Sequence, residues 1–481
     1  MIDNLIESAA KIRPTERQLA WSEMEFYAFV HFGLNTFTNR EWGLGNEEPE
    51  IFNPSDFNAN QWVEVCKSAD MKGLILTCKH HDGFSLWPSE YTEHSVKNSP
   101  WKQGKGDMVR EVSEACKRGG IKFGVYLSPW DRHEKTYGDS KVYNEYFVKQ
   151  LRELLTNYGE VFCVWFDGAC GEGPNGKRQV YDWDAYYKVI RELQPNAVIS
   201  VCGPDVRWCG NEAGQCRESE WSAVPVNLKD AEKIQEESQK VDDGMFSKLV
   251  DSRDSDLGSR EVIKSAEDLI WYPAEVNTSI RPGWFYHDSE DDKVKSLDEL
   301  LKVYYGSVGG NSTFLLNFPP DKRGLIHEND AARMKEFGNT IREMFKENLT
   351  VNVEASASET MDESHNVQNM FDDNKNTYWC PEEGTEKCEI KIDLKDDKEL
   401  DTVVLQEHVI NGQRVEKFTF EYWDGHIWNK FYNGTVIGYK RICRFDKVIA
   451  RYIRFTIVNS RWCPEISNME IYLSKIAETI K

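Results

Sequence analysis

The first two thirds of the chain alternates short apolar runs with amphipathic stretches. The apolar runs are rich in β-branched and aromatic residues, which is typical of strands that are buried on both faces. The stretches between them repeat apolar residues every three or four positions, which predicts helices. Repeated strand–helix units predict a parallel sheet with right-handed crossovers. The expected strands are 26–33, 73–78, 121–127, 161–166, 197–202, 269–275 and 313–317, and the expected helices are 60–71, 107–118, 142–158, 185–193, 297–308 and 331–347.

An α/β fold of the (β/α)8 type, a TIM-like barrel, is the leading interpretation for this stretch. A doubly wound sheet is the alternative. The turn after the first strand holds neither a G-x-G-x-x-G motif nor a P-loop, which disfavours nucleotide binding. The stretch 205–265 is polar and acidic, and we expect it to form long loops on the active-site side.

The pattern changes near residue 348. Beyond it, apolar and polar residues alternate in short runs that are separated by turn residues, and the helical periodicity is gone. This pattern predicts an all-β sandwich that follows the barrel. The expected domains are therefore 1–348 and 349–481, and the expected strands of the second are 389–394, 401–409, 417–423, 451–458 and 468–473.

Charge and cysteine content exclude some partners and compartments. The 481 residues include 59 basic and 81 acidic side chains, a net charge of −22. Such a field repels polyanions, so neither nucleic acid nor an anionic membrane is expected as a partner. The twelve cysteines contain no C-x-x-C pair, which favours buried thiols in a reducing compartment. The N-terminus lacks a basic and apolar leader, so we expect a cytoplasmic protein, although a chain trimmed of its export signal would look the same.

Polar and aromatic residues follow the expected strands. Asp167 ends the apolar run 161–166, and a lone carboxylate is costly to bury. In a parallel barrel the carboxyl ends of the strands carry the chemistry, so we expect Asp167 to face a cleft. The alternative is an ordinary turn or N-cap aspartate. Residues of the same kind after the other strands are His31, His80, His81, Asp82, Tyr126, Trp130, Asp131, Asp205, Arg207, Trp208 and Glu212.

The consecutive histidines His80 and His81 raise the question of a metal. Consecutive residues on a strand point to opposite faces, so both reach one ion only if the strand breaks there. No metal-binding motif supports such a site, and we expect no cofactor for catalysis. The indoles of Trp42, Trp87 and Trp284 are expected either to cover the apolar patch of a sugar or to pack in the core.

Six segments together resemble the α-L-fucosidases of glycoside hydrolase family 29. They are 31–37 (HFGLNTF), 41–43 (EWG), 76–84 (LTCKHHDGF), 124–130 (GVYLSPW), 164–169 (VWFDGA) and 281–286 (RPGWFY). The resemblance implies that Asp167 is the nucleophile. It also implies a fucose pocket lined by His31, Glu41, Trp42, His80, His81, Tyr126 and Trp284. The segment 203–214 (GPDVRWCGNEAG) resembles the subgroup that prefers α-1,3 and α-1,4 linkages in Lewis-type glycans.

The expected function is therefore a retaining exo-α-L-fucosidase acting on a fucosylated oligosaccharide or glycoconjugate. The alternatives are a retaining glycosidase for another sugar, such as an α-galactoside, and a catalytically inactive glycan-binding protein.

The general acid is open between Glu212, Glu218 and Glu220. A retaining enzyme needs two carboxyl groups about 5–5.5 Å apart. Arg217 can pair with Glu218 or Glu220, which would lower the pKa of either group and make it a poor acid. Small neighbours let Glu212 bend into the pocket, where Trp208 can desolvate it. We therefore choose Glu212, which the subgroup resemblance also implies.

The C-terminal region resembles the discoidin-like sandwiches that include family 32 carbohydrate-binding modules. The matching segments are 369–379 (NMFDDNKNTYW), 451–458 (RYIRFTIV) and 465–471 (EISNMEI). The resemblance implies a structural calcium held by Asp372, Thr377 and Glu470, although Asp373 stands where many relatives have glycine. This domain either binds sugar or packs against the barrel, and we expect packing because no aromatic cluster is evident at its loops.

Overall fold

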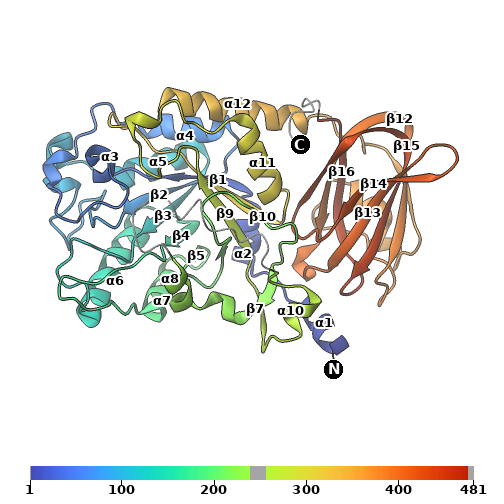
Figure 1. The fold of residues 1–481 in the computed structure, drawn as a ribbon, viewed down its shortest axis with the longest axis horizontal. Coiled ribbons are helices and arrows are strands. Elements are labelled where there is room, and N and C mark those ends of the chain that lie inside the picture. Colours follow the sequence, from blue (N-terminus) through green and yellow to red (C-terminus); the bar gives the residue numbers. More distant parts are fainter. Residues whose placement is uncertain (1, 239–255, 475–481) are drawn as a thin grey trace.

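The computed structural model describes residues 2–238 and 256–474. An α/β barrel comes first along the chain, and a β-sandwich follows beside it (Figure 1). Each has its own buried apolar core, one centred on the barrel strands and the other between the strands of the sandwich. Among the described residues, no helix is both long and apolar enough to cross a bilayer.

Eight parallel strands form the barrel. Their order is β5-β4-β3-β2-β1-β10-β9-β6, and a parallel bridge between Ser200 and Val206 links the two ends of this sheet, so that the barrel is nearly closed. The predicted TIM-like fold is therefore confirmed. The strands are β1 (Phe26–Val30), β2 (Gly73–Lys79), β3 (Lys122–Leu127), β4 (Cys163–Phe166), β5 (Val198–Val201), β6 (Arg207–Trp208), β9 (Ala274–Ser279) and β10 (Ser312–Asn317).

Helices surround the barrel strands, and polar side chains define where several of them begin. Asp107 accepts a hydrogen bond from the backbone N–H of Arg110, and Ser296 forms a capping box with Glu299. The helices are α1 (Ile2–Ala10), α2 (Glu16–Ser22), α3 (Leu34–Thr38), α4 (Ala59–Ser68), α5 (Met108–Gly119), α6 (Ser140–Asn157), α7 (Trp183–Leu193), α8 (Ala231–Glu237), α10 (Arg260–Ile263), α11 (Leu297–Ser307) and α12 (Glu328–Met344).

Two predictions for the second half of the barrel need correction. The expected strand 269–275 is two strands, because Pro273 has no N–H to continue a ladder. The first is β8 (Leu269–Trp271), which pairs antiparallel with β7 (Ala223–Pro225), and the second is β9. The stretch 205–265 also contains β6, β7, α8 and α10, and is not loop throughout. Its residues 239–255 lie outside the described part of the chain.

The sandwich is antiparallel, as the alternating pattern predicts. Two of its strands are much longer than expected, because bulges let one strand continue where the apolar alternation breaks. The expected runs 389–394 and 401–409 belong to a single strand. The strands are β11 (Glu354–Ala357), β12 (Cys388–Glu407), β13 (Val415–Trp423), β14 (Trp428–Gly434), β15 (Arg441–Ser460) and β16 (Ile466–Tyr472).

Asn311 is a polar link between the two domains. Its amide Nδ2 donates to the carbonyl oxygen of Glu220 at 2.8 Å, and its Oδ1 accepts from the backbone N–H of Tyr439 at 2.7 Å. Its own N–H donates to the Lys440 carbonyl. Asn311 is buried and has a left-handed φ of 65°, a conformation that asparagine tolerates better than most residues. One side chain thus holds a barrel loop and a sandwich loop together.

Replacing Asn311 with alanine should destabilise the protein by about 1–3 kcal/mol, because the Tyr439 N–H loses its acceptor and the Glu220 carbonyl keeps Gln413 alone of its two side-chain donors. Asn352 is the matched control, since it has a φ of 64° but is exposed. Asn352→Ala should lower the free energy of unfolding only by the cost of placing alanine at a left-handed φ. Denaturant unfolding of both variants checks this, and equal losses would show that Asn311 contributes backbone conformation alone.

Candidate active site

A pocket of about 660 Å³, its open mouth included, lies at the carboxyl ends of the barrel strands. The expected site residues come together here: Asp167 and Glu212 line the same pocket. Trp208 and Asn277 form part of its wall, where the Trp208 indole donates to Asn277 Oδ1 at 2.9 Å. The remaining predicted residues in its lining are His31, Glu41, Trp42, His80, His81, Tyr126 and Trp284.

Asp167 follows β4 directly and is held by hydrogen-bond donors. The Tyr126 hydroxyl donates to Oδ2 at 2.9 Å, and the Ala169 N–H donates to Oδ1 at 2.8 Å. Nε2 of His81 lies 3.7 Å from Oδ2. The carboxylate is a quarter exposed, so it is fixed in orientation and still open to the pocket. This is the arrangement that an anionic nucleophile requires.

His80 and His81 both line the pocket because β2 ends at Lys79, just before them. Their ring centroids are 4.1 Å apart. Both histidines can reach one site only if the strand breaks there, and the structure meets this condition. As a result, ligand atoms of His80, His81 and Asp167 lie within 4.8 Å of one another, a set that also has the composition of a metal site.

The tautomer of His81 follows from its neighbours. Its Nδ1 lies 2.7 Å from the Ser128 hydroxyl, which donates its own hydrogen to the Trp130 carbonyl at 2.6 Å. The hydroxyl must therefore accept from Nδ1–H, which leaves Nε2 as an acceptor. Burial lowers the pKa of His81 to about 4, although the nearby Asp167 charge opposes this. At neutral pH the ring is uncharged and can accept a hydrogen bond from a sugar hydroxyl.

Asn317, at the end of β10, fixes His31 in the same way. Its Oδ1 accepts from the backbone N–H of His31 at 3.2 Å and from Nδ1 of the same ring at 2.8 Å. Its Nδ2 donates to the carbonyl of Trp284 at 2.8 Å. Burial lowers the pKa of His31 to about 3, so this ring is also neutral with an acceptor Nε2. Sequence reasoning missed Asn317, although it is the last residue of an expected strand and the strand-end rule applied to it.

Glu212 is set in a different environment from Asp167. Its Oε2 accepts a hydrogen bond of 3.0 Å from the Trp284 indole. Burial, together with the charges of Asp167 and Glu41, raises the pKa of Glu212 to about 7, although the Trp284 hydrogen bond opposes the shift. The residue expected to desolvate it, Trp208, lines the same pocket but bonds to Asn277. Glu212 can thus carry a proton near neutrality.

Glu41 holds the loop that carries Trp284. Its carboxylate accepts from the backbone N–H groups of Trp284 at 2.8 Å and Phe285 at 3.2 Å. Nε2 of His287 lies 2.7 Å from the same carboxylate. Most of its hydrogen-bonding capacity is therefore used within the protein, and Glu41 shapes the pocket as well as lining it.

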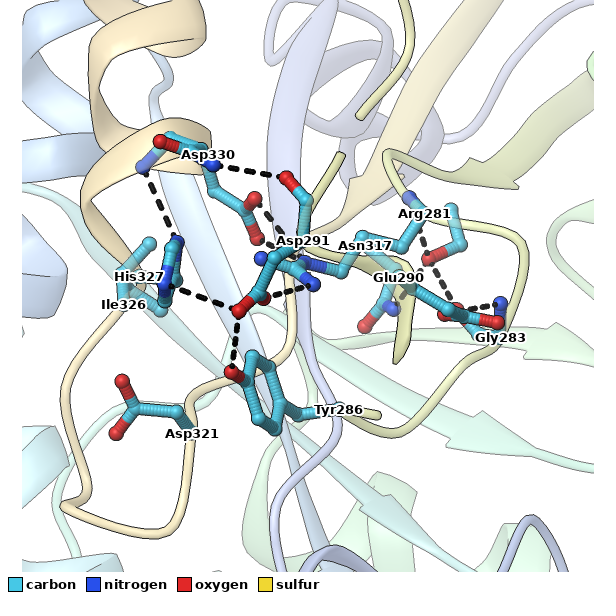
Figure 2. A network of polar contacts seen from close by, with 12 residues as sticks. Arg281, Gly283, Tyr286, Glu290, Asp291, Asn317, Asp321, Ile326, His327 and Asp330 are labelled. Atoms are coloured by element: carbon cyan, nitrogen blue, oxygen red, sulfur yellow. Dashed lines mark hydrogen bonds and ion pairs between the residues drawn. The ribbon is translucent and has the colours of Figure 1, made fainter. Parts of the chain in front are cut away.

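A second polar network anchors the same loop from behind, as Figure 2 shows. The guanidinium of Arg281 has no exposed surface, and it donates to Asp330 at 2.8 Å and to Asp291 at 2.9 Å. The Tyr286 hydroxyl donates to Asp291 at 3.2 Å, and His327 Nε2 lies 3.5 Å from the same carboxylate. This network ties the Trp284 loop to the beginning of α12. The loop that carries the Trp284 indole is therefore fixed by Glu41, which binds its backbone, and by the network of Arg281 at its start.

Glu218 and Glu220, the other candidates for the acid, do not line the pocket. Glu220 is buried between two guanidinium groups, with Arg207 Nη2 at 2.6 Å and Arg217 Nη1 at 3.3 Å. Glu218 is exposed, and its carbonyl accepts from Arg441 at the interface with the sandwich. Arg217 pairs with Glu220, one of the two partners expected for it.

Five residues expected at the mouth of the barrel are absent from the pocket lining, and they are Asp82, Trp130, Asp131, Asp205 and Arg207. Asp205 accepts from the backbone N–H of Ile199 and pairs with Arg191, so its carboxylate braces β5. Arg207 pairs with Glu220, and the other three are buried. Trp87, for which sugar contact and core packing were the alternatives, is buried and donates to Glu153.

The residues proposed for calcium lie in the sandwich. Asp372 Oδ2 accepts from the Thr377 hydroxyl at 2.7 Å, and the same hydroxyl lies 2.8 Å from the Asn374 carbonyl. Glu470 is on β16, which packs against the turn that precedes Asp372. Carboxylate, hydroxyl and carbonyl oxygens of this kind are the ligands that calcium prefers.

Comparison with known proteins decides the family. Residues 15–344 match the α-L-fucosidase family model, and residues 354–470 match the F5/8 type C domain. This chain belongs to the α-L-fucosidase family. Its fucosidase domain is the barrel that holds the pocket, and its C-terminal domain is discoidin-like, so the two resemblances seen in the sequence are confirmed at this level.

Several relatives match this fucosidase along almost its whole length. Alpha-L-fucosidase 1 of Arabidopsis thaliana is 40% identical over 475 residues, which cover 96% of this chain and 88% of that protein. A crystal structure of a Ruminococcus gnavus GH29 fucosidase in complex with fucose is 33% identical, with a TM-score of 0.83 over 96% of this chain and 95% of the other. A Bacteroides ovatus protein assigned as an α-L-fucosidase is 48% identical, with a TM-score of 0.86 over 99% of this chain and 76% of the other. The chain is a glycoside hydrolase.

Asn317→Ala should lower kcat/KM on an aryl α-L-fucoside by about tenfold or more, because His31 loses the acceptor that fixes its tautomer and the Trp284 loop loses a donor. Asn329→Ala is the control, since the Asn329 amide bonds only to the Asp291 carbonyl in the outer part of the same region. Steady-state kinetics of both variants test this. An Asn317 variant with unchanged kcat/KM would show that His31 is oriented by packing instead.

Proposed function

We propose that this fucosidase is a retaining exo-enzyme that removes terminal α-1,3- or α-1,4-linked L-fucose from Lewis-type glycans. The observation that carries the proposal is the contrast between two carboxyl groups in one pocket. Asp167 is surrounded by hydrogen-bond donors and is partly open to solvent, whereas burial raises the pKa of Glu212 to about 7. Carboxyl pairs whose environments differ in this way divide the roles of nucleophile and acid.

The reaction proceeds in two displacements. Asp167 attacks the anomeric carbon while Glu212 gives its proton to the departing glycosidic oxygen, which forms a fucosyl-enzyme ester. Glu212, now ionised, takes a proton from water, and this water attacks from the face that the leaving group has vacated, displaces the Asp167 carboxylate and restores the original anomeric configuration. The Tyr126 hydroxyl donates to Asp167 throughout, so it orients the nucleophile and stabilises the carboxylate when it leaves.

The neutral histidines support a sugar substrate. His31 and His81 each offer an unprotonated Nε2, and both line the pocket with the indoles of Trp42, Trp208 and Trp284. Ring hydroxyls donate to such nitrogens, and indoles cover C–H faces. The linkage preference rests on the segment 203–214, which carries Glu212 and resembles the α-1,3/1,4 subgroup.

The substrate can be tested with two aryl glycosides that differ mainly at C6. L-fucose carries a methyl group where L-galactose carries a hydroxymethyl group, and an apolar wall leaves that extra hydroxyl without a partner. We expect 4-nitrophenyl α-L-fucoside to be hydrolysed with a kcat/KM at least about a hundredfold above that of the α-L-galactoside. Comparable rates on both would support a broader glycosidase, and release from neither would support a glycan-binding protein.

Glu212→Ala should lose much more activity on a Lewis-type trisaccharide than on 4-nitrophenyl α-L-fucoside, because nitrophenolate leaves without a proton. The wild-type rate on the trisaccharide should also fall as the pH rises through about 7, since burial raises the pKa of Glu212 to about 7 and the acid works only while protonated. In Glu212→Ala this basic limb should disappear from the pH profile.

Glu220→Ala is the matched control for this prediction. Glu220 is paired with Arg207 and Arg217, so its loss leaves two buried guanidinium charges without the carboxylate that compensates them. We expect it to lower protein stability and to weaken activity on both substrates by similar factors. Selective loss on the trisaccharide in Glu220→Ala, with equal losses in Glu212→Ala, would move the assignment to Glu220.

We further propose that Asp372, Thr377 and Glu470 hold a structural calcium ion, which takes no part in catalysis. Removal of the ion with EGTA should lower the melting temperature of the protein, and calcium should restore it where magnesium does not. The same titration of Asp372→Ala should show no response. If neither EGTA nor calcium changes the melting temperature of the wild type, the site is refuted.

A further inference from the structure

Two cysteine thiols meet in the sandwich, far along the chain from each other. Cys380 follows Trp379, whose backbone forms an antiparallel bridge with Ile466 through hydrogen bonds of 2.9 and 3.0 Å. Cys463 lies in the turn between β15 and β16, just before Ile466. The bridge holds the two segments side by side and brings the sulfurs of Cys380 and Cys463 into contact. The Cys380 thiol also donates to the Pro381 carbonyl at 3.3 Å.

Donors surround the sulfur of Cys463. Nη1 of Arg414 lies 3.6 Å from Sγ and 2.8 Å from the carbonyl oxygen of the same residue. The backbone N–H of Gly384 also donates to this sulfur, and the Cys380 sulfur is in contact with it. Glu465 is the opposing charge, since Arg414 Nη1 also donates to its carboxylate at 2.6 Å. Positive and hydrogen-bonding surroundings of this kind stabilise a thiolate.

The pKa of the Cys463 thiol is shifted in the opposite direction from that of the neighbouring buried thiol Cys388. Contact with Cys380 is the largest cause that lowers the pKa of the Cys463 thiol, and it outweighs burial. Burial instead raises the pKa of the neighbouring Cys388 to about 12. A thiolate attacks oxidants and a thiol does not, so oxidation at these positions is expected to begin at Cys463.

We propose that Cys463 and Cys380 are an oxidisable pair, in which Cys463 reacts first and Cys380 closes a disulfide across the sandwich. Both residues are at most 4% exposed, so the oxidant must be small, and hydrogen peroxide is of the right class. The Cys463 thiolate attacks one peroxide oxygen and breaks the O–O bond, which yields a sulfenic acid and, after protonation, water. The Cys380 sulfur then attacks the sulfenic sulfur, an S–S bond forms, and the hydroxyl leaves as a second water.

The disulfide would join two cysteines between which most strands of the sandwich lie in the sequence. Strands β12, β13, β14 and β15 all lie between Cys380 and Cys463 in the chain. Closing a loop of that length restricts the unfolded chain much more than the folded one. Oxidation should therefore raise the melting temperature of the sandwich. The pair lies outside the residues that line the pocket, so the hydrolysis of aryl fucosides should not change.

The test uses the full-length protein, reduced and freed of reductant, then exposed to hydrogen peroxide. We expect the intact mass to fall by about 2 Da for the loss of two hydrogens. A non-reducing digest should contain a peptide that links Cys380 to Cys463, and dithiothreitol should reverse both changes. The melting temperature should be several degrees higher in the oxidised protein. A digest that lacks this linked peptide, or that links Cys463 to Cys388, would overturn the proposal.

Three variants separate the roles of the two sulfurs. Cys380→Ser should trap Cys463 as a sulfenic acid that dimedone labels, because no second thiol is present to resolve it. Cys463→Ser should leave Cys380 unlabelled. Cys388→Ser is the control and should form the disulfide like the wild type. Dimedone labelling of Cys463→Ser at Cys380 would reverse the assigned order, and loss of the disulfide in Cys388→Ser would place the reactive pair elsewhere.

Discussion

The hydrogen bond from the Trp284 indole to Glu212 joins the two loops that complete the pocket. One loop follows β6 and carries Glu212, and the other follows β9 and carries Trp284. Burial by these loops raises the pKa of Glu212 to about 7, while Asp167 on the rigid end of β4 keeps its donors. Misplacement of either loop would expose Glu212 to water and remove the contrast between the two carboxyl groups. The contacts that anchor these two loops therefore keep the pocket intact.

Each loop is anchored by groups that never reach the pocket. Behind Trp284, the buried guanidinium of Arg281 is fixed by Asp330 and Asp291. On the Glu212 side, the chain from 217 to 222 is held by the sandwich. Gln413 of the sandwich accepts from the Ser222 N–H and donates to the Glu220 carbonyl. The discoidin-like domain therefore stabilises the segment that follows Glu212, which gives it a structural role in the site.

How much of this could be read from the sequence depended on the length of each element. Long apolar runs predicted the central strands, and the carboxylate after one of them, Asp167, lies in the pocket as expected. Strand β6 has two residues, which is too short for any periodicity. The break of β2 before His80 also left no signal in the apolar pattern, so only the family resemblance placed both histidines in the pocket. The contacts that set the histidine tautomers join residues that are distant in the chain, 286 positions for His31 and Asn317 and 47 for His81 and Ser128.

Chemical rescue of Asp167→Gly tests most directly whether Asp167 is the nucleophile of a retaining fucosidase. The variant should fold normally and should lose several orders of magnitude in turnover of an aryl α-L-fucoside, because no carboxylate remains to attack the anomeric carbon. Azide enters the space left by that carboxylate and attacks from the same face, so it should restore cleavage and give β-L-fucosyl azide. Proton NMR of the product distinguishes the anomers. The α-azide, or an Asp167→Gly enzyme that azide cannot rescue, would contradict the account.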